Sequence, residues 1–375
     1  MHRHVKLVQL LLFVLAASAA HADPAAAQNR QRFLYVASPG VRDYVEWGGH
    51  GVLVFDIDHG HKFVKRISLA GYGVDDRGKV LNVKGICAHA RSGRLYVSTL
   101  KQLIAIDLNA DRVLWQKTFD KGCDRMSIAP DGSVIYLPSL ENDVWYVVDA
   151  ATGDEIKRLE LKSKAHNTVF GTSGMRVYLA GLGSPLLSVA TTDGHKIERT
   201  VGPFSAPVRP FTVNANETLL FANVNDLLGF EIADLRTNKV IHRVEVTGFA
   251  KGQPKRHGCP SHGIGLTPDE REIWLSDGYN SRVHVFDATA MPPKQVASIA
   301  LREQPGWVTF TAAIDNVLAY PSTGEVIDVR TRKIVAALAD EKGRPVHSEK
   351  LLEIDFVDGK PATNGDQFGV GRILP

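Results

Sequence analysis

The chain has 375 residues, of which 44 are lysine or arginine and 41 are aspartate or glutamate, so its formal net charge is +3. This near balance argues against electrostatic attraction to nucleic acid or to a lipid surface. The length would suit two domains, but a single closed array of repeats fits it equally well.

The first segment, Met1 to Ala22, predicts a secretory signal peptide. Arg3 and Lys6 precede an apolar core, and small residues precede the expected cleavage site before Asp23. An uncleaved membrane anchor is the alternative, but the apolar run is shorter than the roughly 20 residues that a bilayer requires. Cleavage removes two cations and no anions, leaving a net charge of +1. We expect a flexible segment over residues 23–31 and a periplasmic or secreted protein with no membrane span.

Three strands follow without a first strand before them: Arg32 to Ser38, Val52 to Asp58 and Lys62 to Leu69. They resemble the second, third and fourth strands of a repeat. A long insertion, Val41 to His50, separates the first two and carries Tyr44 and Trp47. Aromatic residues on such a loop suit a lid or a partner contact, and packing over the blade is an equal alternative.

Six complete repeats come next, spaced by about forty to fifty residues. The clearest spans His257 to Ala290, where a turn containing Pro268 separates the first two strands, and Lys294 to Leu301 supplies the fourth strand. In every unit except the one near Ala190, the third strand ends in an aspartate: Asp56, Asp107, Asp149, Asp234, Asp287 and Asp328. Four antiparallel strands in about forty residues are typical of one propeller blade.

The last predicted strand, Lys350 to Phe356, has no second strand to follow it. Pairing it with the three N-terminal strands completes a seventh blade and closes the ring, which removes exposed sheet edges. The sequence therefore predicts an all-β fold, a seven-bladed β-propeller of four-stranded antiparallel blades. We expect it to form a single domain over residues 32–375 and to be a monomer.

The Pro-Asp-Gly turns and the V-x-V-x-D third strands, as in Ala129 to Leu137 and Val283 to Ala288, resemble the YVTN-type β-propeller repeat proteins. These lie near the quinoprotein amine dehydrogenase heavy-chain superfamily. The resemblance covers essentially the whole mature chain, although the literal tetrad is absent and Tyr96 to Thr99 is the nearest match. It implies a fold more than a function, because the matching residues form turns and strand cores.

The starting ends of the innermost strands surround one mouth of a propeller's channel. Aligned on their turns, the repeats place there a mostly polar set of residues: Gly85, Asp124, His166, Arg209, His262 and Trp307. The C-terminal strand adds His347, Ser348 or Glu349. We interpret this ring as a ligand-binding site, although a water-filled channel would also have a polar lining.

The histidines suggest a metal at this mouth. His166, His262 and His347 could converge as imidazole ligands, with Asp124 or Glu349 supplying a carboxylate, a set that suits zinc, copper or another divalent transition metal. Separately, His257, Cys259 and His262 form an H-x-C-x2-H run that could chelate. The alternative is that Cys259 is a buried apolar residue and His257 a loop residue.

Arg209 suggests a different ligand. A guanidinium at the rim, near Lys84 and Arg125, would bind a carboxylate or phosphate in bidentate fashion. A salt bridge to Asp124 or Glu349 is the alternative role. An anionic small molecule held by Arg209 and the histidines agrees with the pattern.

Three cysteines are an odd number for an exported protein, so we expect at least one to be unpaired unless it binds a metal or another chain. Cys87 falls within an inner strand. Cys123 and Cys259 both precede inner strands at the channel mouth, and a disulfide between them is one possibility that would cap the channel.

Two classes of function remain open. The sequence favours a non-catalytic exported propeller that binds a small ligand or an envelope protein at the channel mouth. The second class is an enzyme with a metal at the mouth, such as a lactonase-like hydrolase or lyase, in which the metal acts as a Lewis acid on a carbonyl. The resemblance also implies a possible subunit of a periplasmic quinoprotein redox system. No motif identifies a catalytic residue.

Overall fold

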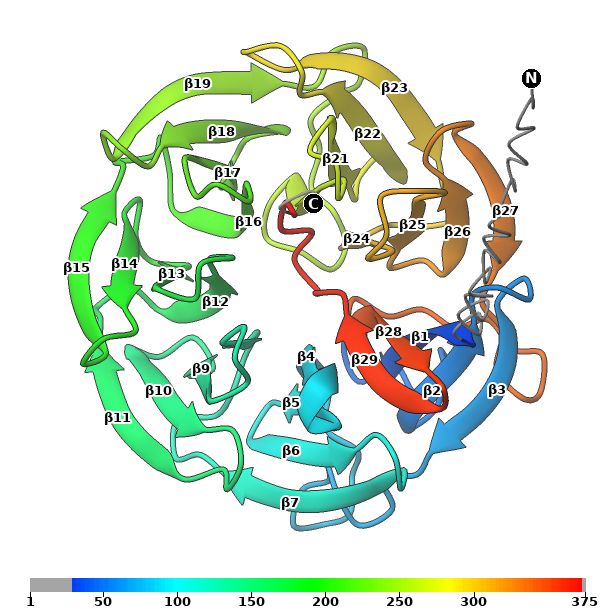
Figure 1. Cartoon of the computed structure of the whole chain (residues 1–375). Coiled ribbons are helices and arrows are strands. Elements are labelled where there is room, and N and C mark those ends of the chain that lie inside the picture. The colour runs from blue at the N-terminus through cyan, green and yellow to red at the C-terminus, as the bar shows by residue number, and fades with distance from the viewer. Residues whose placement is uncertain (1–28, 373–375) are drawn as a thin grey trace, which may run out of the picture.

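The structure, a computed structural model, describes residues 29–372, which form seven antiparallel sheets around a central axis (Figure 1). The predicted seven-bladed β-propeller is confirmed. The predicted signal peptide, Met1 to Ala22, lies outside the described residues. Between residues 29 and 372, no helix has the length and hydropathy that a membrane span requires.

Six blades have four strands that follow one another in sequence. The first three contain β4 (Val83–His89), β5 (Arg94–Thr99), β6 (Gln102–Asp107) and β7 (Arg112–Thr118); β8 (Ser127–Ile128), β9 (Val134–Pro138), β10 (Val144–Asp149) and β11 (Glu155–Glu160); and β12 (Ala165–Phe170), β13 (Arg176–Gly181), β14 (Leu187–Thr191) and β15 (Lys196–Val201). A short 3-10 helix, η1 (Ala90–Ser92), joins β4 to β5.

The next three blades continue around the ring. They contain β16 (Val208–Val213), β17 (Leu219–Val224), β18 (Gly229–Asp234) and β19 (Lys239–Glu245); β20 (Ser261–Leu266), β21 (Glu272–Asp277), β22 (Arg282–Asp287) and β23 (Lys294–Ala300); and β24 (Val308–Phe310), β25 (Leu318–Pro321), β26 (Glu325–Asp328) and β27 (Lys333–Ala337). In each blade the first strand lies nearest the axis and the last lies on the rim (Figure 1).

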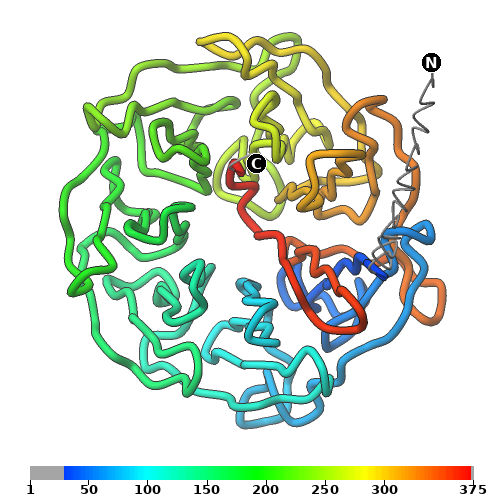
Figure 2. Tube along the Cα trace, in the orientation of Figure 1, coloured from blue at the N-terminus to red at the C-terminus, as the bar shows by residue number. Residues whose placement is uncertain are grey.

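The closing blade joins the two ends of the described chain, as predicted. β28 (Leu351–Val357) pairs with β1 (Arg30–Ser38) over seven residue pairs, and β2 (Gly51–Asp56) and β3 (Lys62–Ile67) complete the four strands. Figure 2 shows the first and last parts of the chain side by side in this blade. The prediction that no strand follows β28 is wrong, because β29 (Lys360–Asn364) turns back and pairs with it at the inner edge of the sheet.

The aspartates that end the third strands explain why the repeats turn where they do. The carboxylate of Asp107 accepts hydrogen bonds from the backbone N–H groups of Asn109 and Ala110, at 2.8 and 3.1 Å. The carboxylate of Asp149 likewise accepts hydrogen bonds from the backbone N–H groups of Ala151 and Thr152. Such a side chain satisfies the donors of a tight turn after a strand. The six predicted aspartates each end a third strand.

The core lies between neighbouring blades. Leu352 of β28 and Val97 of β5, for example, belong to one cluster of fully buried side chains that joins the closing blade to the next blade. Tyrosines of the second strands add polar links, since the Tyr96 hydroxyl donates to the carbonyl of Ala150 in the adjacent blade at 2.7 Å. Burial of this apolar surface therefore stabilises the ring rather than each blade alone.

We expect Leu352→Ala to lower the free energy of unfolding by about 2 to 5 kcal/mol, because it removes a buried side chain and leaves a cavity at the ring closure. Val335→Ala is the matched control, since Val335 is 56% exposed on the outermost strand β27 and should change stability by less than about 0.5 kcal/mol. Urea denaturation followed by circular dichroism measures both. Equal effects of the two substitutions would contradict the packing of β28 into the ring.

Candidate functional site

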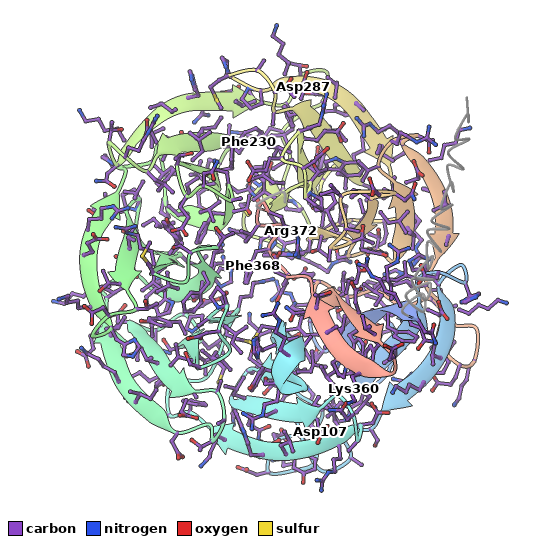
Figure 3. The ribbon with its side chains drawn as sticks, viewed as in Figure 1. Asp107, Phe230, Asp287, Lys360, Phe368 and Arg372 are labelled. Carbon is purple, nitrogen blue, oxygen red and sulfur yellow. The ribbon has the colours of Figure 1, made fainter. Side chains whose placement is uncertain are left out.

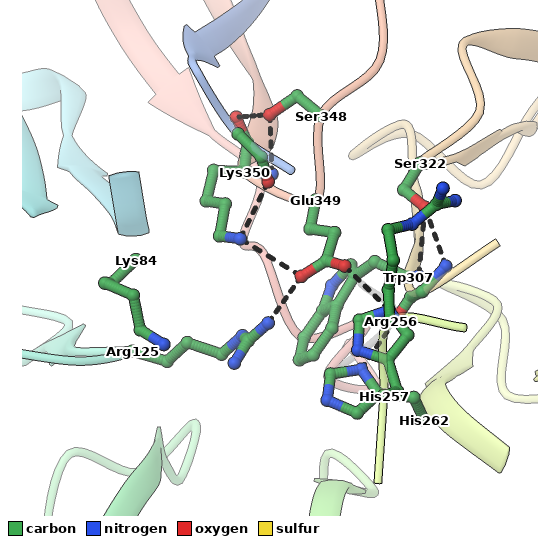
Figure 4. Close-up of polar contacts among 12 residues, drawn as sticks. Lys84, Arg125, Arg256, His257, His262, Trp307, Ser322, Ser348, Glu349 and Lys350 are labelled. Atoms are coloured by element: carbon green, nitrogen blue, oxygen red, sulfur yellow. Dashed lines mark hydrogen bonds and ion pairs between the residues drawn. The ribbon is translucent and has the colours of Figure 1, made fainter. Parts of the chain in front are cut away.

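The starting ends of the inner strands surround a cavity of about 140 Å3 at one channel mouth. Six basic side chains line it: Arg42, Lys84, Arg125, Arg209, Arg256 and Lys350. The other ionisable side chains in the lining are two carboxylates and three imidazoles: Glu141, Glu349, His166, His257 and His262. Figure 4 shows how the central members of this set point toward one another. Basic groups therefore outnumber acidic ones at this mouth.

Asp124 lies just before β8, and its carboxylate is fully buried. It accepts a hydrogen bond from His166 Nδ1 at 2.7 Å and lies 3.3 Å from Lys84 Nζ. Burial alone would raise the pKa of Asp124, but the charge of Lys84, the hydrogen bond from His166 and the charge of Arg125 lower it well below its ordinary value. Asp124 is therefore an anion that anchors basic neighbours rather than a proton donor.

His166, at the start of β12, is held as a neutral imidazole. Its Nδ1–H donates to Asp124, and its Nε2 accepts from Arg125 Nη1 at 3.3 Å. Burial lowers the pKa of His166 although Asp124 opposes this. Both ring nitrogens are thus engaged, which leaves no lone pair of His166 free for a metal.

Glu349 connects three basic groups. Its Oε2 accepts from Arg125 Nη2 at 2.6 Å and from Lys350 Nζ at 3.0 Å, and its Oε1 lies 3.1 Å from His257 Nε2 (Figure 4). Burial alone would raise the pKa of Glu349, but Lys350, His257 and Arg125 together hold it well below its ordinary value. Arg125 also lies over the indole of Trp307, 4.7 Å from the ring centroid.

His257 and His262 stack on each other, with ring centroids 4.0 Å apart and an interplanar angle of 19°. His262 Nδ1 donates to the carbonyl of Gly306 at 2.8 Å, so Nε2 of the neutral ring carries a lone pair. Burial lowers the pKa of His262 far below its ordinary value, and His257 and Arg125 lower it further. Burial also lowers the pKa of His257, so both imidazoles are uncharged at neutral pH.

A metal could be held here only by His257, His262 and Glu349, whose donor atoms lie within 4.8 Å of one another; no other such cluster occurs between residues 29 and 372. The backbone partner of His262 is typical of a metal-binding imidazole. The charges fit less well, because Arg125 and Lys350 both occupy Glu349 Oε2 and would repel a divalent cation.

Arg209 has a different environment from Arg125. Its Nε donates to Asn225 Oδ1 at 2.5 Å and its Nη2 to the carbonyl of Gly258 at 3.2 Å. Among residues 29–372, neither Arg209 nor Arg42 has a carboxylate within ion-pair distance. The predicted alternative, a salt bridge from Arg209 to Asp124 or Glu349, is not formed.

The predicted ring is partly assembled. Arg209, His262, His166 and Glu349 line the cavity, with Asp124 and Trp307 buried against it. His347 is not part of it: its Nδ1 lies 3.3 Å from Glu303 Oε1 and its ring packs on Trp47 at 4.4 Å. A three-imidazole centre of His166, His262 and His347 is therefore not brought together.

The insertion Val41 to His50 packs at the rim of the mouth. Trp47 contacts His347 and lies under the guanidinium of Arg256, 5.1 Å from the ring centroid, and Arg42 donates to the backbone carbonyl of Arg256. The loop before β20 and the insertion thus meet beside the cavity. Lys350 and Arg256 line the cavity although the repeat alignment does not predict them; the signal for Lys350 is its position directly after Glu349.

The predicted disulfide between Cys123 and Cys259 is absent, since all three cysteines are free and buried. Cys123 packs into the apolar cluster between the first two blades with Met126 and Tyr146. Burial raises the pKa of Cys259 to about 12, so its thiol remains protonated and is a poor metal ligand. Cys259 is therefore a buried apolar residue, the alternative considered for it.

Comparison with known proteins does not assign the chain to a family. No protein-family model matches the chain, and no curated protein matches it in sequence. The interpretation of the mouth therefore rests on its own geometry.

We expect Glu349→Gln to lower the free energy of unfolding at pH 7 by about 3 to 5 kcal/mol, because it leaves the guanidinium of Arg125 buried without its anion. Glu341→Gln is the matched control, since Glu341 forms an exposed ion pair with Arg66 worth at most about 1 kcal/mol.

The difference between wild type and Glu349→Gln should depend on pH. The folded pKa of Glu349 lies well below its ordinary value, so its contribution is complete above about pH 4.3 and is lost as the pH falls toward the folded pKa. Urea denaturation between pH 3 and pH 7 measures it. A difference that stays constant over this range would contradict an ionised Glu349 in the folded protein.

Proposed function

We propose that the protein is an exported, YVTN-type β-propeller that binds a small anionic ligand at the channel mouth. The export part rests on the sequence of Met1 to Ala22, and the repeat type rests on the turn and strand patterns. The binding part rests chiefly on Arg209, a guanidinium that faces the cavity without a carboxylate partner among the described residues.

The charge of the mouth supports an anion. Asp124 and Glu349 neutralise Lys84 and Arg125 in part, and burial lowers the pKa of Lys350 to about 7, while Arg209 and Arg42 remain uncompensated. A guanidinium presents two parallel N–H groups that match a carboxylate or a phosphate. In a recess with limited access to water, this attraction is stronger than at an open surface.

The size and the neutral histidines narrow the ligand class. A cavity of about 140 Å3 is smaller than the roughly 300 to 1,000 Å3 typical of drug-sized ligands. His262 Nε2, with its lone pair, can accept a hydrogen bond from a ligand hydroxyl. A compact carboxylate, hydroxy acid or phosphate therefore suits the mouth best.

Arg125 is already fixed for such a ligand. Its guanidinium is held by Glu349, by His166 and by the face of Trp307, so it loses little side-chain freedom on binding. A group ordered before binding costs less conformational entropy than one that must be ordered by the ligand.

We expect Arg209→Ala to weaken binding of inorganic phosphate or succinate by roughly 10- to 100-fold, the value of one charge-assisted hydrogen bond, in isothermal titration calorimetry. Arg236→Ala is the matched control, because Arg236 is exposed and pairs with Asp234 at a blade edge. Uncharged succinamide should not bind. Equal binding of succinate to wild type and Arg209→Ala would contradict the proposal.

A metal-dependent enzyme is the second candidate, and the cluster of His257, His262 and Glu349 is the observation that favours it. A divalent ion there would supply a Lewis acid for a carbonyl, as in a lactonase-like hydrolase or lyase. The quinoprotein alternative has no supporting residue at this mouth.

Metal analysis of the purified protein separates the two candidates. The anion proposal expects no stoichiometric zinc or copper after dialysis, and no change in metal content with His262→Ala. One equivalent of metal in wild type, lost in His262→Ala, would instead support the enzyme. His59→Ala, which removes an exposed imidazole outside the cluster, is the control that should leave any bound metal in place.

A further inference from the structure

The last described residues cross the second mouth of the channel. After β29 the chain leaves the closing blade and reaches the centre of the ring (Figures 1 and 2). This C-terminal tail, Gly365 to Arg372, is fixed by hydrogen bonds to three blades. Trp307 Nε1 donates to the carbonyl of Gln367 at 2.6 Å, Thr212 Oγ1 to that of Gly369 at 2.7 Å, and Leu266 N to the same carbonyl at 2.9 Å.

These three donors belong to the blades of β16, β20 and β24, so the backbone of the tail lies against that side of the mouth, while the side chain of Gln367 reaches across to β4. On the other side, a cavity of about 370 Å3 lies between the tail and the far ends of β4, β8 and β12. It is lined chiefly by apolar side chains: Ile86, Cys87, Ile128, Phe170, Phe368 and Val370. Figure 3 shows Phe368 and Arg372 near the centre of the ring.

An apolar wall is unexpected in this place. The end of a channel that opens to water would ordinarily carry polar groups, as the first mouth does, because apolar surface left in water is unfavourable by about 25 cal/mol per Å2. A recess of this size with an apolar wall and a few polar groups at its edge has the form of a small-molecule site.

The charged groups at its edge are two arginines, Arg91 and Arg372, and one carboxylate, Asp366. Arg372 lies 3.7 Å from Asp366, so these two charges offset each other. Arg91, exposed on η1, has no carboxylate within ion-pair distance among residues 29–372. The backbone of η1 is held beside the cavity, because Asn364 Oδ1 accepts a hydrogen bond from the N–H of the preceding residue, Ala90, at 2.9 Å. One cationic group therefore remains beside the apolar wall.

We propose that this second cavity binds a small organic acid with an aromatic or branched apolar body. The body would lie against Ile128, Phe170 and Phe368, and the acid group would face Arg91. The site is separate from the anion-binding mouth. Gln367 lies between them, with Nε2 donating to the carbonyl of Glu349 at 3.0 Å and Oε1 accepting from Ile86 N at 2.9 Å.

The dye 8-anilino-1-naphthalenesulfonate tests this site, because it combines one anionic group with an aromatic body and fluoresces in apolar surroundings. We expect one dye to bind per chain. Ile128→Glu should abolish binding, since it places a carboxylate in the cavity at a partly exposed position. Arg91→Met should weaken it roughly fivefold, the value of about 1 kcal/mol for an exposed charge pair. Arg209→Ala, at the other mouth, should bind the dye as wild type does.

Displacement of the dye by small ligands gives a second measure of binding, and it does not depend on a substitution that could disturb folding. Naphthalene-2-carboxylate should displace the dye from wild type roughly fivefold better than naphthalene-2-carboxamide, and Arg91→Met should remove this difference. Equal displacement by the acid and the amide, or dye binding that both variants leave unchanged, would overturn the proposal. A many-fold gain in dye binding by a chain that ends at Arg372 would also overturn it, because residues 373–375 would then compete with the dye for the cavity.

Discussion

Strand β28 lies between β1 and β29, and the chain on either side of it reaches opposite ends of the channel. Glu349, two residues before the strand, enters the first mouth, and the tail that follows β29 crosses the second. The pairing of β28 with β1 therefore closes the ring and also places residues at both mouths. Loss of this one pairing would expose two sheet edges, and the residues from this part of the chain would no longer be held at either cavity.

The first mouth depends on how buried charge is compensated. A carboxylate or an ammonium group removed from water is costly unless a partner replaces its hydration. Asp124 and Glu349 supply such partners to Lys84 and Arg125, so these cations can line a recess. Arg209 has no such carboxylate partner among residues 29–372. The uncompensated positive charge of Arg209 and Arg42, rather than the overall charge of the chain, is what favours an anionic ligand there.

The fold could be predicted because its rules are local and repeated. An aspartate after each third strand satisfies the N–H groups of the next turn, and the alternation of apolar residues marks each strand, so both signals occur in unit after unit. Ring closure followed from counting strands at the two ends. β29 and the tail escaped prediction because they belong to no repeat and carry no alternating pattern.

The site was predicted less completely, since it depends on register and side-chain direction. The repeat alignment placed Asp124, His166, Arg209 and His262 correctly around one mouth, but it left three residues open for the closing blade. The structure places Glu349 in the channel and turns His347 toward Trp47. Sequence spacing likewise gave no distance between Cys123 and Cys259, and in the structure both thiols are free, with Cys123 packed in an apolar cluster.

Hydrogen–deuterium exchange of the full chain tests the closed ring most directly. We expect the backbone amides of β1 and β28 to exchange as slowly as those of second strands such as β5 and β13, because both pair on two sides within a continuous sheet. Exchange of β1 and β28 within seconds, while the other six blades stay protected, would show that the ring is open and that the two mouths do not exist as described.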